Sequence, residues 1–286
     1  MREPGEVVAA AFPRPGRALK AVLIAIAFFA IAGAVVVNWA PGPPAGTELF
    51  KWVVFQPHEF LKHPWMVWTL LTSGIFTNPE GFSHALWSLV GLYFLTTDLE
   101  KKWGGARMLR FLGISVVMGN LMVLAVDQLP IRSAFFHPPV VLGPLAAITA
   151  TAMAWAKENA TRQIRLFFFL PISGKTLYWV TIGGAVLALL FMQGTPEGAA
   201  SLFGGILAGL MFGGTPSPVR SAWLRVKLAV MRRQGHALTV ESITGSDRLR
   251  APKRASKGGP PLRVVQGGLD DDLKNRKPPK DKRYLN

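Results

Sequence analysis

Two side chains suited to acid–base chemistry lie four residues apart in an apolar segment. His84 and Ser88 have the spacing that places both on one face of a helix. A histidine can accept the proton of a serine hydroxyl, and the activated hydroxyl can then attack a carbonyl carbon. Two interpretations stay open: the pair forms a polar site open to water, or His84 is hydrogen-bonded within a helix bundle.

Ser201 is a second hydroxyl that could act as a nucleophile, with His84 or His137 as its base. The simpler interpretation is that Ser201 caps a helix, because serine is common at helix starts. The chain has no cysteine, which excludes a thiolate nucleophile, a disulfide and a thiolate metal site. Its histidines and carboxylates show no metal-ligand spacing, so we expect neither a metal nor a cofactor. It also has no phosphate-binding glycine loop, which argues against an ATP-driven pump.

These residues belong to a chain that is half apolar and contains long apolar stretches. A helix needs about 20 mostly apolar residues to cross roughly 30 Å of hydrocarbon. The stretches are too numerous for the buried helices of a soluble protein, and we predict an all-α membrane protein with six spanning helices. They are placed at residues 21–40, 82–99, 108–126, 140–156, 176–192 and 198–213.

Positive charge alternates between the connections, and this alternation predicts the orientation. Lys and Arg in short flanking segments resist translocation, so basic connections stay in the cytoplasm. The long connection between the first two predicted helices carries only Lys51 and Lys62. We therefore expect both termini in the cytoplasm and a location in a bacterial cytoplasmic (inner) membrane. The basic connections hold Arg2, Arg14, Arg17 and Lys20; Lys101, Lys102, Arg107 and Arg110; and Lys157, Arg162, Arg165 and Lys175.

The chain divides by composition into four parts. A cytoplasmic segment covers residues 1–20, a membrane domain covers 21–214, a basic amphipathic helix covers 215–234, and a disordered basic tail covers 235–286. Each Lys or Arg near an anionic lipid surface contributes about 1 kcal/mol to binding, so we expect the amphipathic helix to lie on such lipids. The tail is rich in Gly, Pro and charge, which predicts disorder. We do not expect nucleic-acid binding.

The segment from residue 68 to 104 resembles the rhomboid family of intramembrane serine proteases. It is similar to the family's outer loop ending in Trp-Arg-x-x-Thr, its second helix with His-x-x-x-Asn, and the Glu-x-x-x-Gly that closes this helix. The matching residues are Trp68, Thr72, His84, Glu100 and Gly104. The resemblance extends from about residue 21 to 214 and implies a six-helix bundle with a long first outer loop.

The catalytic positions of the family are apolar in this chain. Rhomboids use a serine in Gly-x-Ser-Gly at the start of the fourth helix, and here Gly143 is followed by Pro144 and Leu145. Aligning the glycines of the sixth helix puts Leu202 at the position of the catalytic histidine. No change of register restores the pair, because no serine lies between residues 133 and 173 and no histidine between 137 and 236. The family's oxyanion asparagine corresponds to Ser88, and its loop arginine to Thr69.

The resemblance therefore implies a rhomboid-like pseudoprotease, an inactive homologue of a serine-type endopeptidase. Such relatives bind transmembrane helices of client proteins, and we expect a client to enter between the second and fifth helices. The predicted binding residues are His84, Ser88, Gly143, Leu145 and Leu202. Gly205 and Gly209 are expected to form a smooth face for the fourth helix. The alternatives are an active rhomboid-type endopeptidase with non-standard residues and an unrelated six-helix membrane component.

Overall fold

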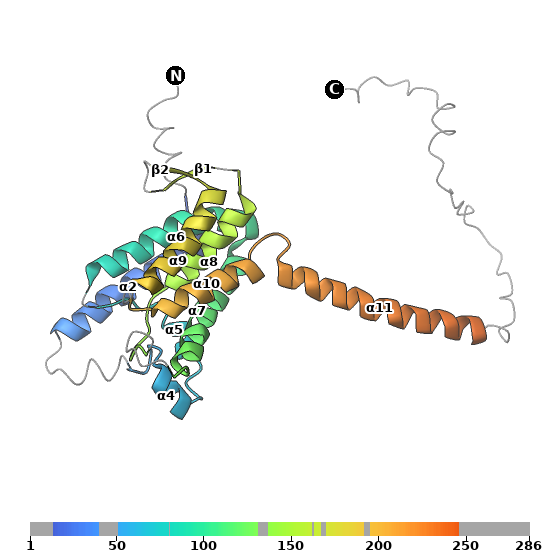
Figure 1. Cartoon of the computed structure of the whole chain (residues 1–286), viewed down its shortest axis with the longest axis horizontal. Coiled ribbons are helices and arrows are strands. Elements are labelled where there is room, and N and C mark those ends of the chain that lie inside the picture. The colour runs from blue at the N-terminus through green and yellow to red at the C-terminus, as the bar shows by residue number, and fades with distance from the viewer. Residues whose placement is uncertain are drawn as a thin grey trace, which may run out of the picture. The chain divides into compact units, whose positions relative to one another are not determined.

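The computed structural model describes residues 14–39, 51–79, 81–130, 137–161, 163–166, 170–191 and 195–245. The chain divides into two units, Met1–Met231 and Arg232–Asn286. The helices are α2 (Arg17–Trp39), α4 (Pro57–Lys62), α5 (Thr69–Thr72), α6 (Phe82–Trp103), α7 (Gly105–Asp127), α8 (Leu145–Glu158), α9 (Gly174–Leu190), α10 (Ala199–Phe212) and α11 (Pro218–Gly245). An antiparallel hairpin of β1 (Gln163–Leu166) and β2 (Leu170–Ser173) joins α8 to α9 (Figure 1).

Six of these helices, α2, α6, α7, α8, α9 and α10, occupy the six predicted apolar stretches, with ends that differ by a few residues. The largest difference is the start of α8, predicted at residue 140 and found at Leu145. Val141 is instead extended and pairs with Phe55. Gly143 has a φ of 122° and Pro144 follows it, so a helix cannot begin before Leu145.

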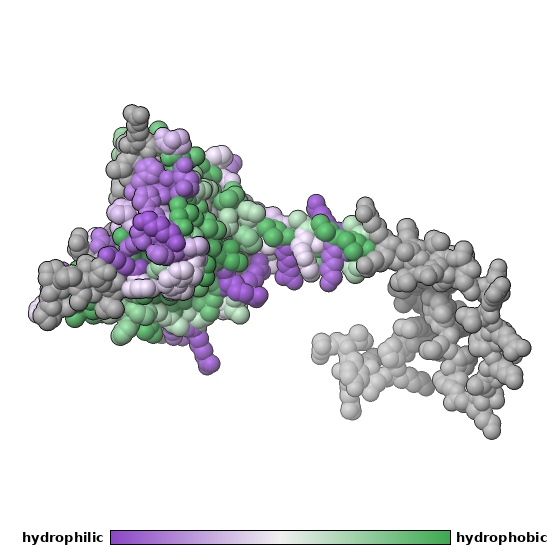
Figure 2. Space-filling view, turned by 90° about the horizontal axis from the view of Figure 1, so that it is seen from below, coloured by the Kyte–Doolittle hydropathy of each residue, from purple (hydrophilic) through white to green (hydrophobic). Residues whose placement is uncertain are grey.

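Two described helices, α2 and α7, are long and apolar enough to cross a membrane, while α9 and α10 are shorter apolar helices. Large apolar side chains on these helices point away from the protein. Ile24 and Phe28 on α2 and Leu187 on α9 are more than half exposed. Seen from below, hydrophilic residues gather over the end of the bundle that carries α4, with apolar residues beside them (Figure 2). Such an apolar surface suits a lipid environment.

The centre of the bundle is α8, which packs against α6, α7, α9 and α10 (Figure 1). It is rich in alanine, and its side chains from Ala146 to Ala156 are mostly buried. Small side chains let neighbouring backbones approach closely. A Cβ atom added at Gly205 or Gly209 of α10 would collide with α8 backbone at Ala146 or Ala150. Gly205 and Gly209 therefore lie on the face of α10 that packs against α8.

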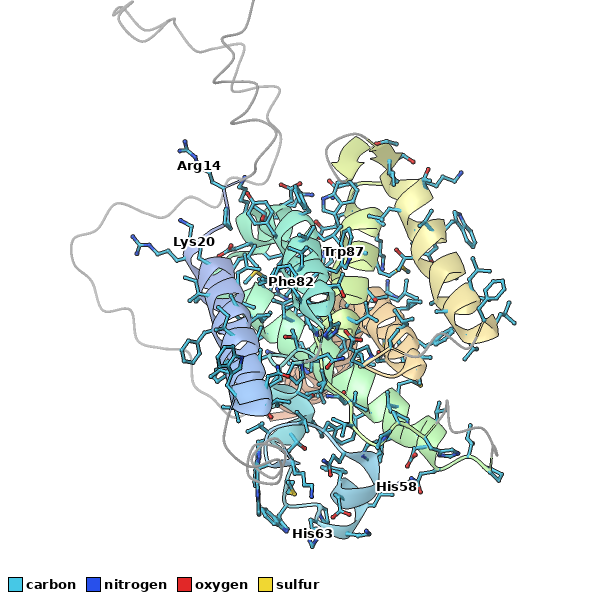
Figure 3. All side chains as sticks on the ribbon, turned by 90° about the vertical axis from the view of Figure 1, so that its left-hand side faces the viewer. Arg14, Lys20, His58, His63, Phe82 and Trp87 are labelled. Carbon is cyan, nitrogen blue, oxygen red and sulfur yellow. The ribbon has the colours of Figure 1, made fainter. Side chains whose placement is uncertain are left out.

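Three basic segments meet at one end of the bundle. The carboxylate of Glu100, at the end of α6, accepts hydrogen bonds from the backbone N–H groups of Gly16, Ala18 and Leu19 at the start of α2. Lys102 donates to Asn159 after α8, at 2.9 Å. Arg107 on α7 donates to the carbonyl of Gly214 after α10. Figure 3 shows Arg14 and Lys20 at this end.

The remaining connections meet at the opposite end, where Figure 3 shows His58 and His63. Leu142, before α8, donates its N–H to the carbonyl of Pro196, before α10, at 3.0 Å. Gly143 donates its N–H to the carbonyl of Ser73 after α5 at 2.9 Å. Consecutive long helices therefore run in opposite directions, and the connections alternate between the two ends.

The basic helix predicted for residues 215–234 is present but longer, because α11 extends from Pro218 to Gly245. Residues 235–245, which the sequence assigns to the tail, belong to this helix in the structure. The stretch 236–244 contains the helix formers Ala, Leu and Glu and no glycine or proline, so nothing in it breaks the helix. The glycine and proline clusters that predicted disorder begin only after it. Residues 246–286 lie outside the described residues.

Candidate functional site

His84 lies in the first turn of α6, just after Gly81, where its imidazole is held from both sides. The backbone N–H of Asn78 donates to His84 Nδ1 at 2.9 Å. Because Nδ1 accepts this bond, it carries no proton, and the proton of the neutral imidazole must be on Nε2. The tautomer of His84 is therefore set by the chain that precedes α6.

The Nε2 atom of His84 lies 2.7 Å from Oε1 of Glu197, a residue 113 positions later in the chain. With the proton on Nε2, His84 donates this hydrogen bond and Glu197 accepts it. The two side chains are only 15% and 5% exposed. A short hydrogen bond to a buried carboxylate is among the stronger polar interactions in a protein. It links the start of α6 to the loop before α10.

Glu197 is positioned by two neighbouring loops. The hydrogen bond from Leu142 to Pro196 fixes the loop before α10, and Gly198 turns the chain into α10 with a φ of 74°. A Cβ atom at Gly143 would collide with the side chain of Glu197. Gly143 is therefore required both by its positive φ and by the space that the carboxylate occupies.

His84 and Glu197 line one end of a cavity of about 540 Å³ between α6, α8, α9 and the start of α10. Polar atoms gather near this end, from Ser88 and Thr195. Farther along, the wall consists of small and apolar side chains, including Leu95 and Ala152. In the described chain, α8 packs against both α6 and α9, but α6 and α9 have no extensive contact with each other. The cavity lies between these two helices.

Four of the five predicted binding residues line this cavity: His84, Ser88, Leu145 and Leu202. The fifth, Gly143, lies behind it against Glu197. Leu145 comes from the first turn of α8 and Leu202 from the first turns of α10, so the two apolar residues face the same space from different helices. His84 is hydrogen-bonded within the bundle and also lines the cavity.

The predicted structural residues lie outside the cavity. The Trp68 indole donates to the carbonyl of Trp52 at 2.9 Å and ties the segment before α5 to the preceding loop. The Glu100 carboxylate caps the start of α2. Gly104 has a φ of 78° and forms the turn between α6 and α7, a conformation that favours glycine.

Ser201 does not form a catalytic pair with either candidate base among the described residues. Its side chain is buried toward Gly119 of α7, and its hydroxyl has no hydrogen-bond partner in the described part of the chain. Both nitrogens of His84 are used by Asn78 and Glu197, and Nδ1 of His137 lies 2.9 Å from Asp127. The interpretation of Ser201 as a helix cap is wrong, because Gly198 is the N-cap and no side chain caps this helix.

Asp127 is a buried carboxylate at the same end of the bundle, held by two histidines that are partly or mostly exposed. Its two carboxylate oxygens lie 3.1 Å from Nδ1 of His58 and 2.9 Å from Nδ1 of His137. Its side chain is 1% exposed, so the two imidazoles satisfy a carboxylate that would otherwise be costly to bury. The described residues contain no group of three His, Cys, Asp or Glu side chains arranged to hold a metal ion. This cluster joins the first long loop to the end of α7.

The sequence interpretation missed Glu197 and Thr195. The available signal was a single acidic residue directly before a glycine-rich apolar helix, because ionisable side chains next to or within apolar spans are rare and frequently functional. Nothing in the spacing connected this residue to His84.

A family model described as "Eukaryotic integral membrane protein (DUF1751)" matches residues 20–209, which includes the helices from α2 to most of α10 and every residue that lines the cavity. No curated protein matches the chain.

Proposed function

Because the chain belongs to this family of integral membrane proteins, we propose that it is a six-helix membrane protein with a rhomboid-like bundle and both termini in the cytoplasm. The support is the alternation of its connections. The basic segments meet at one end through Glu100, Lys102 and Arg107, and the less basic loops meet at the other. Both facts fit an arrangement in which every long helix crosses the membrane.

The function that the cavity supports best is lateral binding of a transmembrane segment without cleavage, as in a rhomboid-like pseudoprotease. The observation that carries this proposal is the shared cavity of Leu145, Leu202, His84 and Ser88. It lies between α6 and α9, which pack on α8 rather than extensively on one another. A client helix would enter between α6 and α9 and contact the apolar wall, with its polar groups near His84.

We propose that the protein does not cleave its clients, because of the residue types at the two catalytic positions. A leucine can neither donate nor accept a proton, so Leu145 and Leu202 cannot act as nucleophile and base. His84 also lacks a free nitrogen, since its Nδ1 and Nε2 are engaged by Asn78 and Glu197. A histidine with both nitrogens engaged is better suited to binding a client and stabilising the bundle than to transferring a proton.

The amphipathic part of α11 is proposed to contact anionic lipids at the cytoplasmic face. Trp223, Val226 and Leu228 are at least half exposed, and Lys227 lies 5.1 Å from the centre of the Trp223 ring. Exposed apolar side chains among basic ones suit the interface of a charged leaflet. The location in a bacterial cytoplasmic membrane stays a prediction. The description of the matched family names eukaryotic proteins.

In-cell photocrosslinking from position 145 tests the binding proposal. A photoreactive amino acid replaces Leu145 in the full-length protein, and captured material is identified by mass spectrometry. Discrete membrane proteins crosslinked through their transmembrane segments are the expected result. Capture of lipid alone would contradict the proposal.

The proposal of an inactive enzyme is tested separately, with a serine-reactive probe and a generic rhomboid substrate. We expect neither labelling nor cleavage by the purified protein. Labelling that disappears in Ser201→Ala would support the alternative of an active endopeptidase with non-standard residues.

A further inference from the structure

The carboxylate of Glu197 is satisfied on one side only. Its Oε1 atom accepts the hydrogen bond from His84, and its Oε2 atom has no hydrogen-bond donor among the described residues. The side chain is nineteen-twentieths buried, at 5% exposure, and it lines the cavity. Because Glu197 lines the cavity, the open lone pairs of this carboxylate oxygen are available to an occupant.

His84 brings no positive charge to Glu197. His84 Nδ1 accepts the N–H of Asn78, so the imidazole is neutral and supplies a dipole rather than a full positive charge. The hydroxyl of Thr195, which also lines the cavity, is buried without a partner in the described chain. This end of the cavity therefore offers acceptor oxygens to a cation or a hydrogen-bond donor, and the imidazole gives an anion no positive charge to pair with.

The rest of the cavity wall is apolar. Leu95, Ala152 and Leu177 line the part farther from Glu197, and Gly184 leaves room for a bulky occupant, since a Cβ atom added there meets nothing within 4 Å. A suitable ligand has an apolar body and one positive group near its end. A transmembrane helix with a Lys or Arg near its terminus meets this description, because its long aliphatic stem packs against apolar walls while its charged head reaches a polar partner.

We propose that the cavity selects transmembrane segments that carry a Lys or Arg near the end that lies beside Glu197, and that this carboxylate binds the cationic head directly. The inference rests on the proposed binding of client helices and adds the chemistry that would select them. In the proposed orientation, the selected residue lies near the outer end of the client helix.

The test uses the full-length protein in phosphatidylcholine vesicles, with a photoreactive amino acid at position 145. Three transmembrane peptides of identical Leu-Ala sequence carry lysine, norleucine or glutamate at one position near the outer end. The variant Glu197→Gln keeps an oxygen that accepts from His84 but removes the charge. Asp127→Asn is the matched control, because Asp127 is also a buried carboxylate beside histidines but lies outside the cavity lining.

We expect the lysine peptide to be captured at least about tenfold better than the norleucine peptide, and the glutamate peptide least well. Glu197→Gln should bring the lysine and norleucine yields to near equality without lowering norleucine capture, while Asp127→Asn keeps the preference. Equal capture of all three peptides by the unaltered protein would overturn this inference alone. Failure to capture any peptide would instead contradict the proposed function.

A second arm separates a client helix from an aminolipid, which also joins a cation to an apolar body. The vesicles are prepared with and without phosphatidylethanolamine. Preference for the lysine peptide should persist in both. The assignment to a protein ligand would be overturned if phosphatidylethanolamine abolished capture of the lysine peptide and crosslinks to that lipid appeared instead.

Discussion

Nε2 of His84 and Oε1 of Glu197 lie 2.7 Å apart and connect the start of α6 to the loop that begins α10. This contact joins a histidine in the first turn of α6 to a carboxylate 113 residues away. It closes one end of the cavity and leaves one carboxylate oxygen available to a ligand. The same interaction therefore stabilises the bundle and defines the chemistry of the proposed site.

The stabilising part of this relationship is measurable with a double-mutant cycle. His84→Ala, Glu197→Ala and the double variant are compared by the free energy of unfolding in detergent. We expect a coupling energy of about 1.5–3 kcal/mol, because either single change leaves a buried polar group without its partner. The matched control pairs His84→Ala with Glu100→Gln at the other end of α6, where the two effects should add. Additive effects of His84→Ala and Glu197→Ala would show that the contact contributes no coupling.

Glu100 is predicted to hold α2 in the bundle. Its carboxylate accepts three backbone N–H groups at the start of α2, and these donors have no partners within that helix. Glu100→Ala should lower the free energy of unfolding by about 1–2 kcal/mol. The neighbouring Lys101 is exposed, so Lys101→Ala should change stability by less than about 0.5 kcal/mol. Equal stability of the two variants, measured by thermal unfolding, would argue against this cap.

The contact between α10 and α8 should tolerate no added side chain. Gly205→Ala places a Cβ atom against the carbonyl of Ala146, and we expect a loss of about 1–3 kcal/mol. Gly183 on α9 is the matched control, since an added Cβ there meets nothing within 4 Å. Gly183→Ala should leave stability unchanged or raise it by up to about 1 kcal/mol through helix propensity. Thermal unfolding in detergent separates the two variants, and similar losses for both would contradict close packing of α10.

The proposed topology can be tested with single cysteines, because the chain contains none of its own. Lys62→Cys lies in the first long loop and Lys175→Cys at the start of α9, and both native side chains are exposed. A membrane-impermeant maleimide should label position 62 from outside, or from the lumen of an organelle, and position 175 only from the cytoplasmic side. Labelling of both positions from one side would contradict the alternating arrangement.

The positions of the six long helices could be predicted from the sequence because each depends on a local property, the length of an apolar stretch. The close contact of α10 with α8 was also predictable, since Gly205 and Gly209 lie four residues apart and so share one helix face. The start of α8 was predicted too early, because apolar composition continues through residues 140–144 while Gly143 and Pro144 prevent a helix there.

The partner of His84 could not be predicted, because it depends on the fold of the whole bundle. Glu197 lies in a short loop, and only the packing of α10 against α7 and α8 brings it to α6. The burial of the Ser201 hydroxyl toward α7 is a consequence of the same packing. Spacing in the sequence predicts which residues are neighbours on one helix, whereas these contacts join residues on different helices.

The most direct measurement compares crosslinking from the two walls of the cavity with crosslinking from the lipid-facing surface. Photoreactive residues are placed in cells at Leu145 on α8, at Thr181 on the cavity side of α9, and at Leu187, which is 53% exposed and lies outside the cavity lining. Lateral binding between α6 and α9 predicts that positions 145 and 181 capture the same membrane proteins and that position 187 captures mainly lipid. Capture of those proteins equally well from position 187, or of no protein from positions 145 and 181, would contradict it.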